Sequence, residues 1–228
     1  MMTHKIYLFA AMSFAAALFT GCSKYSVSGT IDGHDYVDLS LPSGTLWATC
    51  NIGAATPEEY GDYFAWGETS AKSDYSWATY QFGDQSRLTK YCIESNLGEE
   101  GFTDKRVALE SADDAATVLW GERWCMPTRE QWVELLDYCE CKVTSRSDGV
   151  TEMTFTSKKN GNVLYLSAGG FYAGSTLCQV ELMGEYWSGT LDPTYSGAAK
   201  DFSFGYGSMS VSENSRDTGG SIRPVVRK

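Results

Sequence analysis

A single stretch, residues 120–139, constrains the fold of this chain more than any other. It reads WGERWCMPTREQWVELLDYC, and Gly121 is suited to end a helix because glycine takes a positive φ without a Cβ clash. A short apolar run at residues 124–126 predicts a strand. Thr128 then supplies a helix cap, and Gln131, three residues on, completes a capping box. Apolar side chains recur beyond the cap at helical spacing, which predicts a helix buried along one side: Trp132, Leu135, Leu136 and Cys139.

The N-terminus has the composition of an export signal. Lys5 precedes an apolar run at residues 6–19, which is shorter than the roughly 18 or more residues that a membrane-spanning helix needs. The Gly-Cys pair that follows resembles the end of a bacterial lipoprotein signal, in which Cys22 is lipidated and begins the mature chain. Phe19 departs from this pattern, since leucine is usual there. The alternative is an ordinary buried helix.

We therefore expect residues 1–21 to be a lipoprotein signal peptide, residues 22–35 an anchor linker and residues 36–228 a single domain. The formal net charge is −11, and loss of Lys5 with the signal makes it −12. Such acidity argues against nucleic-acid binding through phosphate contacts and against an anionic membrane surface as partner. It leaves cations or cationic groups as ligands.

Six of the seven cysteines remain once Cys22 carries lipid. An exported chain meets an oxidising compartment, where six cysteines allow about 15 pairings that sequence cannot rank. Apolar surroundings equally suit buried free thiols at Cys125 and Cys139. A zinc site is disfavoured by the cysteine spacing and by a mature chain that keeps only His34. The remaining cysteines are Cys50, Cys92, Cys125, Cys139, Cys141 and Cys178.

The first half of the mature chain is rich in loops. Residues 36–39 and 46–50 predict a hairpin, and residues 51–69 predict irregular structure anchored by aromatic rings at Tyr63, Phe64 and Trp66. A second aromatic group in a polar background is expected to be at least partly exposed: Tyr75, Trp77, Tyr80 and Phe82.

Residues 83–105 predict a long loop whose main anchor is Cys92. Residues 109–120 predict a short helix capped by Ser111 or Asp113. Its apolar side is expected to consist of Ala115, Ala116, Val118 and Leu119.

The second half predicts strands, with hairpin turns at Asp148-Gly149 and Asn160-Gly161. A glycine-rich loop carries Phe171 and Tyr172. Helices are few and central, and no strand-helix-strand alternation repeats, so we expect an α+β fold. The expected strands are residues 143–145, 151–157, 162–166, 186–188, 198–206 and 208–212, with a last short strand ending at Val226.

Several motifs occur in an order that resembles the Fibrobacter succinogenes major paralogous domain, a family of exported, often lipid-anchored bacterial proteins. The resemblance extends from about Gly44 to Val226. The motifs are GDYFAWGET at 61–69, LESADDAATVLWGERWCMPT at 109–128, NGNVLYLSAGG at 160–170, YWSG at 186–189 and SIRPV at 221–225.

The MPT-x-x-x-W segment from Met126 to Trp132 also looks like the formylglycine-generating-enzyme branch of the C-type-lectin-like fold. That resemblance implies a mainly antiparallel twisted sheet, two flanking helices, pairing of the two ends as strands, and a long irregular loop region that carries function. Cys125 departs from the family pattern, which tends to place arginine there.

Catalysis has few candidates in this sequence. A Ser-His-Asp or Cys-His arrangement would have to use His34, and the formylglycine-generating enzymes use a cysteine pair in the C-terminal part. Only Cys178 lies beyond Cys141, so that activity does not carry over with the fold. Calcium-dependent sugar binding lacks its Glu-Pro-Asn or Gln-Pro-Asp signature. Asp113 and Asp114 are better explained as charges at a helix start.

Aromatic rings in loops offer recognition without a metal or cofactor, because a flat apolar face with a polar tip binds at low entropic cost. The candidate ligand-binding residues are Tyr75, Trp77 and Tyr80, followed by Tyr172 and Tyr206. Core packing is the alternative, and it is expected for the remaining tryptophans: Trp47, Trp66, Trp120, Trp124, Trp132 and Trp187.

These features predict a lipid-anchored binding or adhesion module of the cell envelope, at the outer membrane, that recognises a glycan or protein ligand. An enzyme related to the formylglycine generators and a structural surface or appendage subunit are the alternatives. An open, ring-lined groove beside residues 83–105 would favour binding, whereas a fully packed loop would favour the structural role.

Overall fold

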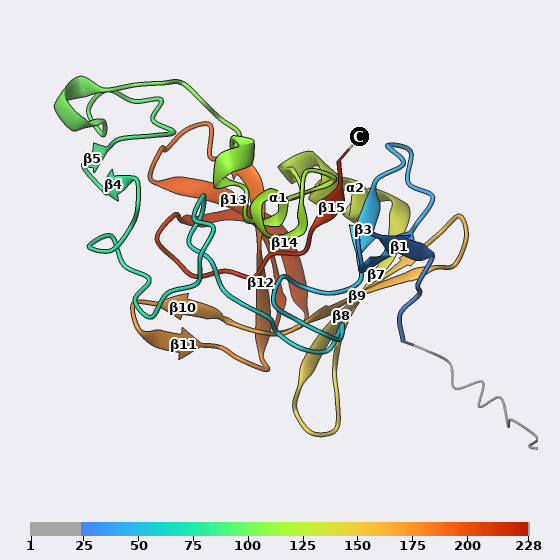
Figure 1. Ribbon diagram of the computed structural model, residues 1–228. Coiled ribbons are helices and arrows are strands. Elements are labelled where there is room, and N and C mark those ends of the chain that lie inside the picture. Colours follow the sequence, from blue (N-terminus) through green and yellow to red (C-terminus); the bar gives the residue numbers. More distant parts are fainter. Residues whose placement is uncertain (1–23, 228) are drawn as a thin grey trace, which may run out of the picture.

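The computed structural model describes residues 24–227, so Cys22 and the predicted signal peptide lie outside the described residues. The described chain is a sheet-rich α+β protein in which mostly antiparallel strands form five sheets (Figure 1). The α+β prediction is confirmed. Among residues 24–227, no helix has both the length and the apolar character needed to cross a membrane.

The largest sheet joins the two ends of the described chain. Its order is β1-β2-β3-β15-β6, with β15 antiparallel to both neighbours. The β2–β3 pairing confirms the predicted hairpin. The pairing of β15 with β3 agrees with the strand pairing of the two ends that the family resemblance implies. The five strands are β1 (Gly29–Ile31), β2 (His34–Asp38), β3 (Leu46–Ala48), β15 (Val225–Val226) and β6 (Trp124–Cys125).

Two three-stranded antiparallel meanders form most of the second half. Each follows chain order, because short turns connect strands that are neighbours in sequence. The predicted turns at Gly149 and Gly161 both have positive φ. The meanders comprise β7 (Cys139–Ser145), β8 (Thr151–Ser157) and β9 (Val163–Ser167), then β12 (Met183–Leu191), β13 (Ala198–Gly205) and β14 (Ser208–Ser215).

Two small hairpins complete the strands. β4 (Gly83–Asp84) pairs with β5 (Arg87–Leu88) inside the segment predicted to be a long loop, and a 3₁₀ turn follows at Glu99–Gly101. β10 (Phe171–Ala173) pairs with β11 (Thr176–Cys178), where a glycine-rich loop is predicted. Tyr75 and Gly219 form bridges to this second hairpin, which explains why it is extended rather than irregular.

The longer helix, α2 (Arg129–Tyr138), begins at the predicted capping box. Thr128 Oγ1 accepts from the backbone N–H of Gln131 at 3.3 Å, and Gln131 Oε1 accepts from the N–H of Thr128 at 2.8 Å. Its buried side packs Trp132 against Phe202 of β13, with ring centroids 4.9 Å apart. Helix α2 is therefore fixed both at its start and along one face.

The shorter helix, α1 (Ala115–Trp120), differs from the prediction. Its cap is Asp114, which accepts from Thr117 N at 3.0 Å, whereas Ser111–Asp113 forms a separate 3₁₀ turn. The Asp114 carboxylate also accepts from Met126 N, which turns the alanine face of the helix inward. Val118 and Leu119 are consequently exposed, at 50% and 49%, and do not belong to the apolar side.

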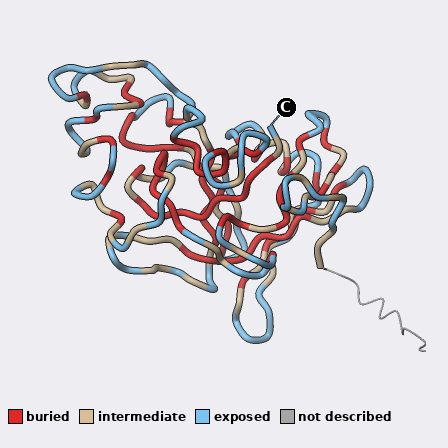
Figure 2. The backbone as a smooth tube through the Cα atoms, in the orientation of Figure 1, coloured by how far each residue is buried: buried red, intermediate tan, exposed pale blue. Residues whose placement is uncertain are grey.

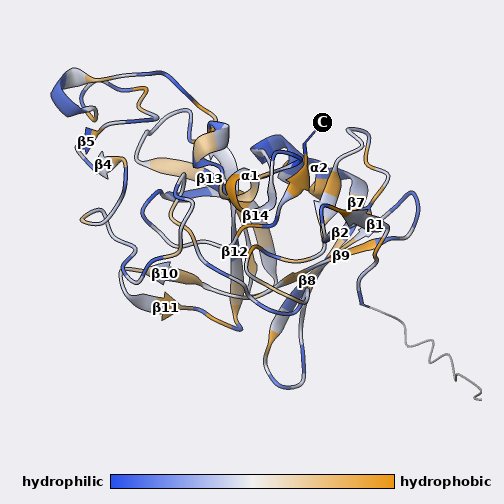
Figure 3. Ribbon diagram, in the orientation of Figure 1, coloured by the Kyte–Doolittle hydropathy of each residue, from blue (hydrophilic) through white to orange (hydrophobic). Residues whose placement is uncertain are grey.

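Two apolar clusters form the core, one around Trp132 and the other around Trp66 and Trp187. In Figure 2 the buried backbone runs through the middle of the molecule. Figure 3 shows apolar residues along β15 beside α2. The tryptophans predicted to be core are fully buried, except Trp120. Trp120 is half-buried, because it packs against the edge of the second cluster and stacks its ring on His34.

Candidate functional site

An open groove of about 370 Å³ lies beside the β4–β5 hairpin, at the left of Figure 1. It is formed by the loop before β4, by the hairpin and by the 3₁₀ turn at Glu99–Gly101. The groove combines an aromatic floor with polar and charged sides. Its lining residues are Trp77, Ala78, Tyr80, Gly83, Asp84, Arg87, Thr89 and Glu99.

Trp77 is the half-exposed ring of this groove. Its indole meets the ring of Tyr80 edge-to-face, with centroids 5.2 Å apart and planes at 79°. Tyr80 is itself buried and held at its hydroxyl, which donates to Trp66 O at 2.7 Å and accepts from Arg216 Nε at 2.8 Å. The exposed indole therefore rests on a fixed support.

Arg216 is the central cation under this support. It is fully buried, and no ion pair is formed by it within residues 24–227. Its guanidinium donates to the carbonyls of Lys90, Tyr91 and Ser196, and it lies 5.0 Å from the Trp66 ring centroid and 5.1 Å from that of Tyr80. Carbonyl oxygens and aromatic faces thus take the place of a carboxylate in stabilising the buried charge.

A second contact set closes the loop that carries Trp77. The buried carboxylate of Glu68 accepts from Gln81 N at 2.8 Å and from Lys72 Nζ at 2.9 Å. Lys72 Nζ also donates to Thr79 O at 3.1 Å. Because these bonds link both ends of the loop, the backbone around Trp77 is positioned before any ligand arrives.

The polar side of the groove is equally ordered. Asp84 accepts from the N–H and the hydroxyl of Ser86, both at 2.9 Å, and from Arg87 Nε at 3.0 Å. The Ser86 N–H, followed by Arg87, lowers the pKa of Asp84 to about 2, so this carboxylate stays ionised at neutral pH. An oriented carboxylate and guanidinium are therefore presented beside the indole.

The five predicted ligand-binding residues occupy three places. Trp77 and Tyr80 form the groove. Tyr75 and Tyr172 stack on each other elsewhere, with ring centroids 5.2 Å apart, and Tyr206 lies in the turn between β13 and β14. The structure therefore does not bring all five into one surface.

The expected exposure of Tyr75, Tyr80 and Phe82 is wrong, because all three are buried, Tyr75 to 2% exposure. Tyr75 donates to Tyr63 O at 2.6 Å, so its hydroxyl finds a partner inside the fold, as that of Tyr80 does. A polar sequence background therefore does not place these rings at the surface. Trp77, which lacks such an internal bond in the described structure, remains half-exposed.

Tyr206 is the most exposed large side chain among the predicted site residues, at 72%. Its hydroxyl is hydrogen-bonded to the side chain of Gln179, just after β11. Tyr206 is not among the residues that line the described grooves. Tyr206 is thus a separate exposed ring without the support that Trp77 has.

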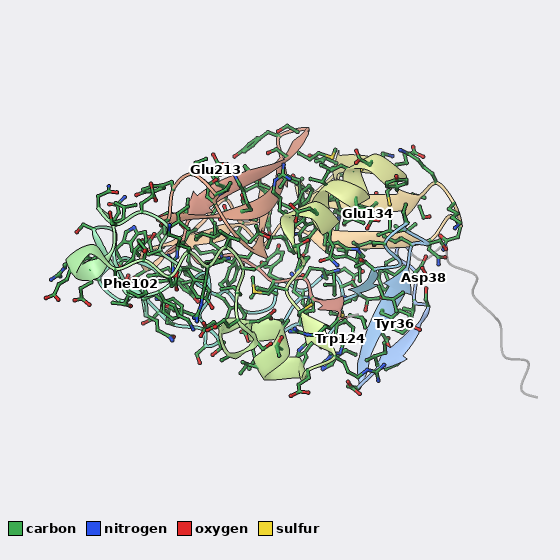
Figure 4. All side chains as sticks on the ribbon, turned by 90° about the horizontal axis from the view of Figure 1, so that it is seen from above. Tyr36, Asp38, Phe102, Trp124, Glu134 and Glu213 are labelled. Atoms are coloured by element: carbon green, nitrogen blue, oxygen red, sulfur yellow. The ribbon has the colours of Figure 1, made fainter. Side chains whose placement is uncertain are left out.

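The segment from 83 to 105 is anchored more firmly than the sequence suggests. Cys92 is buried as predicted, but Leu88 and Tyr91 are fully buried too. Asp104 accepts from the backbone N–H groups of Tyr91 and Cys92, at 2.9 and 3.0 Å. The tip stays exposed: Figure 4 shows Phe102 at the end of the molecule opposite Asp38.

The two aspartates at the start of α1 have structural partners. Asp114 caps the helix, and Asp113 accepts from Lys90 and from the hydroxyl of Tyr91. The interpretation of Asp114 as a helix-start charge is confirmed. Within the described residues, no three His, Cys, Asp or Glu side chains are placed to hold a metal ion.

All six cysteines of the described chain are free thiols. Burial raises the pKa of Cys125 to about 11 and that of Cys139 to about 12, and it raises the pKa of Cys141 as well. The buried-thiol interpretation agrees with the structure for Cys139, whereas Cys125 is only half-buried. Cys125 lies on β6 opposite Val225, where the family pattern expects arginine.

Comparison of the chain with protein-family models, with curated proteins and with solved structures found no match.

Proposed function

We propose that this protein is a lipid-anchored binding module of the cell envelope, with a C-type-lectin-like architecture of the Fibrobacter succinogenes major paralogous type, and that the Trp77 groove binds a glycan. The strand pairing of the two chain ends and the two helices beside antiparallel sheets support the architecture. The single observation that carries the function is the half-exposed indole of Trp77 on a fixed aromatic support.

The chemistry of the groove suits a sugar better than an apolar ligand. A flat indole packs against the C–H face of a pyranose ring, and the ordered Asp84 and Arg87 side chains accept from and donate to its hydroxyls. The groove is open and shallow, which fits one or two sugar units of a longer chain. Because loop and rim are held by internal hydrogen bonds, little ordering cost is added on binding.

A glycan array probed with the mature protein and with Trp77→Ala tests this proposal. We expect glycan binding by the mature protein and an affinity loss of roughly 30-fold or more in the variant, as for an interface hot spot of about 2 kcal/mol. Trp120→Ala is the matched control, because Trp120 is also half-buried but lies outside the groove. Thermal unfolding shows whether both variants are folded. If they are folded and Trp77→Ala binds glycan as the wild type does, the groove is not the binding site.

A protein ligand is the second candidate, because the rim carries Arg87 and Glu99, which also suit a peptide. If no glycan on the array binds, and if the mature protein captures an envelope protein only when Trp77 is present, that protein and not a glycan is the ligand. The enzyme alternative would instead require a redox-active thiol pair, and thiol titration of the native mature protein that finds no such pair would remove it.

The anchor is proposed from the sequence alone, on the Gly-Cys pair that ends the apolar run. Export of the full chain in a bacterial host should give a lipid-labelled product in the membrane fraction. Cys22→Ser should abolish the label and release the chain from the membrane, whereas Cys50→Ser should change neither. A wild-type chain without lipid label would contradict the proposed lipid anchor. It would leave the proposed glycan binding by the Trp77 groove unaffected.

A further inference from the structure

A second groove, of about 240 Å³, contains a thiol that the proposed function does not use. It lies between the start of β2 and the segment that follows β3. One side is the ring of His34 stacked on Trp120, and the other contains Cys50. Its lining residues are Gly33, His34, Asp35, Thr49, Cys50, Ala54, Ala55 and Trp120.

The pairing of β2 with β3 brings His34 and Cys50 to the same groove. Tyr36 pairs with Ala48 across β2 and β3, and Thr49 N donates to Asp35 O at 2.9 Å. The strand β3 ends at Ala48, and the chain bends at Thr49 and Cys50, just beyond this last bond to β2. Both side chains accordingly line the same groove.

The imidazole is fixed and able to accept a proton. Its ring lies 3.7 Å from that of Trp120 with planes 6° apart. Burial lowers the pKa of His34, against a smaller opposing effect of Asp32, so the ring is neutral at neutral pH. A neutral imidazole in the same groove as a thiol can serve as the base that takes its proton.

A buried cation lies on the inner side of Cys50. Arg223 is fully buried, and its guanidinium donates to Ala48 O at 3.3 Å and to Asn51 Oδ1 at 2.9 Å, on either side of Cys50 in the chain. Cys50 is one of the groups with which Arg223 interacts electrostatically. Its Nη2 has no hydrogen-bond partner in the described structure, and no carboxylate there forms an ion pair with it. The thiol is therefore within electrostatic reach of a buried guanidinium that has no carboxylate partner among the described residues.

We propose that Cys50 is a thiol modification site that forms mixed disulfides with small-molecule disulfides, with His34 as the base and Arg223 as the stabilising cation. His34 takes the thiol proton, and the Cys50 thiolate attacks one sulfur of the disulfide. The new sulfur–sulfur bond forms as the old one breaks, and the released thiolate takes up a proton. The disulfide is itself the oxidant, so no other reactant is needed.

The other thiols of the chain provide internal standards. Cys125 and Cys139 are held as thiols by burial. Cys178, at the end of β11, is also half-buried, and its thiol donates to Thr176 O at 3.6 Å. Cys178 therefore falls in the same exposure range as Cys50, but its described contacts include neither an imidazole nor a guanidinium.

Site-resolved labelling of the folded, reduced protein with the neutral reagent iodoacetamide tests the proposal. We expect Cys50 to react at least ten times faster than Cys178, and the buried Cys139 to react only after unfolding. Hydroxyethyl disulfide, also neutral, should give a mixed disulfide at Cys50 first. A neutral probe is used because the charge of Asp32 acts on His34 and would bias the rate of a charged reagent. Equal rates at Cys50 and Cys178 would overturn the proposal.

Two substitutions separate the base from simple access. His34→Phe keeps a flat ring on Trp120, and His34→Ala opens the groove, but both remove the imidazole. We expect both to slow Cys50 labelling at least five-fold while Cys178 is unchanged. If His34→Ala instead speeds labelling, access controls the rate and the proposed role of His34 is wrong. The proposal is independent of glycan binding, since Trp77→Ala should leave the Cys50 rate unaltered.

Discussion

Two buried carboxyl groups lie on neighbouring strands, Glu185 on β12 and Asp201 on β13. Burial, and then repulsion by Asp201, raises the pKa of Glu185 to about 8, although the amide of Asn214 donates to it at 2.6 Å. Burial also raises the pKa of Asp201 to about 6, against the Ser212 hydroxyl that donates to it. Both groups therefore bind protons more tightly in the folded chain than in the unfolded one.

Stability should fall as pH rises through this range. Each carboxyl has a folded pKa above its unfolded value of about 4, so its contribution is complete below about pH 4 and is lost as the pH passes about 6 for Asp201 and about 8 for Glu185. Glu185→Gln should flatten the decline in the free energy of unfolding between pH 5 and 8, where this group contributes about 1.4 kcal/mol per pH unit.

Urea unfolding at several pH values measures this slope. Glu140→Gln is the matched control, because Glu140 lies on strand β7 with an exposed side chain and does not act on either buried carboxyl. An identical pH slope in wild type and Glu185→Gln would mean that Glu185 is ionised in the folded protein.

At the residue scale, the sequence identified the rings but not their exposure. Tyr80 is buried because its hydroxyl bonds to Trp66, 14 residues away, and to Arg216, 136 residues away. Composition near Tyr80 contains no information about such partners. Arg216 itself gave no signal, since a lone arginine in a polar segment resembles a solvated one until the rings around it are known.

At the element scale, local start and turn signals were the most reliable. The capping box, the strand at residues 124–125 and helix α2 lie where the stretch 120–139 predicts them. The start of α1 was less predictable, because Ser111, Asp113 and Asp114 are all good caps. The choice among them depends on the Met126 N–H, which reaches Asp114 only in the folded chain.

Loss of the α2 cap should destabilise the protein measurably. Thr128→Ala removes the hydroxyl that accepts from Gln131 N in the capping box. We expect a loss of about 1 kcal/mol in the free energy of unfolding. Thr128→Ser keeps the hydroxyl and should lose only a small part of this. Chemical denaturation of the three proteins compares them, and equal losses in both variants would show that the threonine methyl matters more than the cap.

At the scale of the whole molecule, the sheet order was beyond sequence patterns. Hairpins such as β2–β3 and β7–β8 are local and were predicted from their turns and strand patterns. The insertion of β15 between β3 and β6 joins segments from three parts of the chain, and only the family resemblance implied that the ends pair. Two-residue strands such as β15 and β6 are also too short to show alternation.

The C-terminal segment links both grooves to the core. Arg216 supports the Trp77 groove through Tyr80, and Arg223 lies beside Cys50. Both are fully buried and bonded mainly to backbone carbonyls. The candidate groove was therefore predicted only through Trp77 and Tyr80, because Asp84, Arg87 and the buried arginine join them by tertiary contacts.

Trp77 is the tryptophan that we propose to contact the ligand. The chain has seven tryptophans, each with one indole N–H that gives a separate NMR signal. Titration of the mature, isotope-labelled protein with the strongest oligosaccharide from the glycan array should shift the signal assigned by Trp77→Ala and leave that of Trp120 in place. Binding that shifts the Trp120 signal and not that of Trp77 would contradict the account.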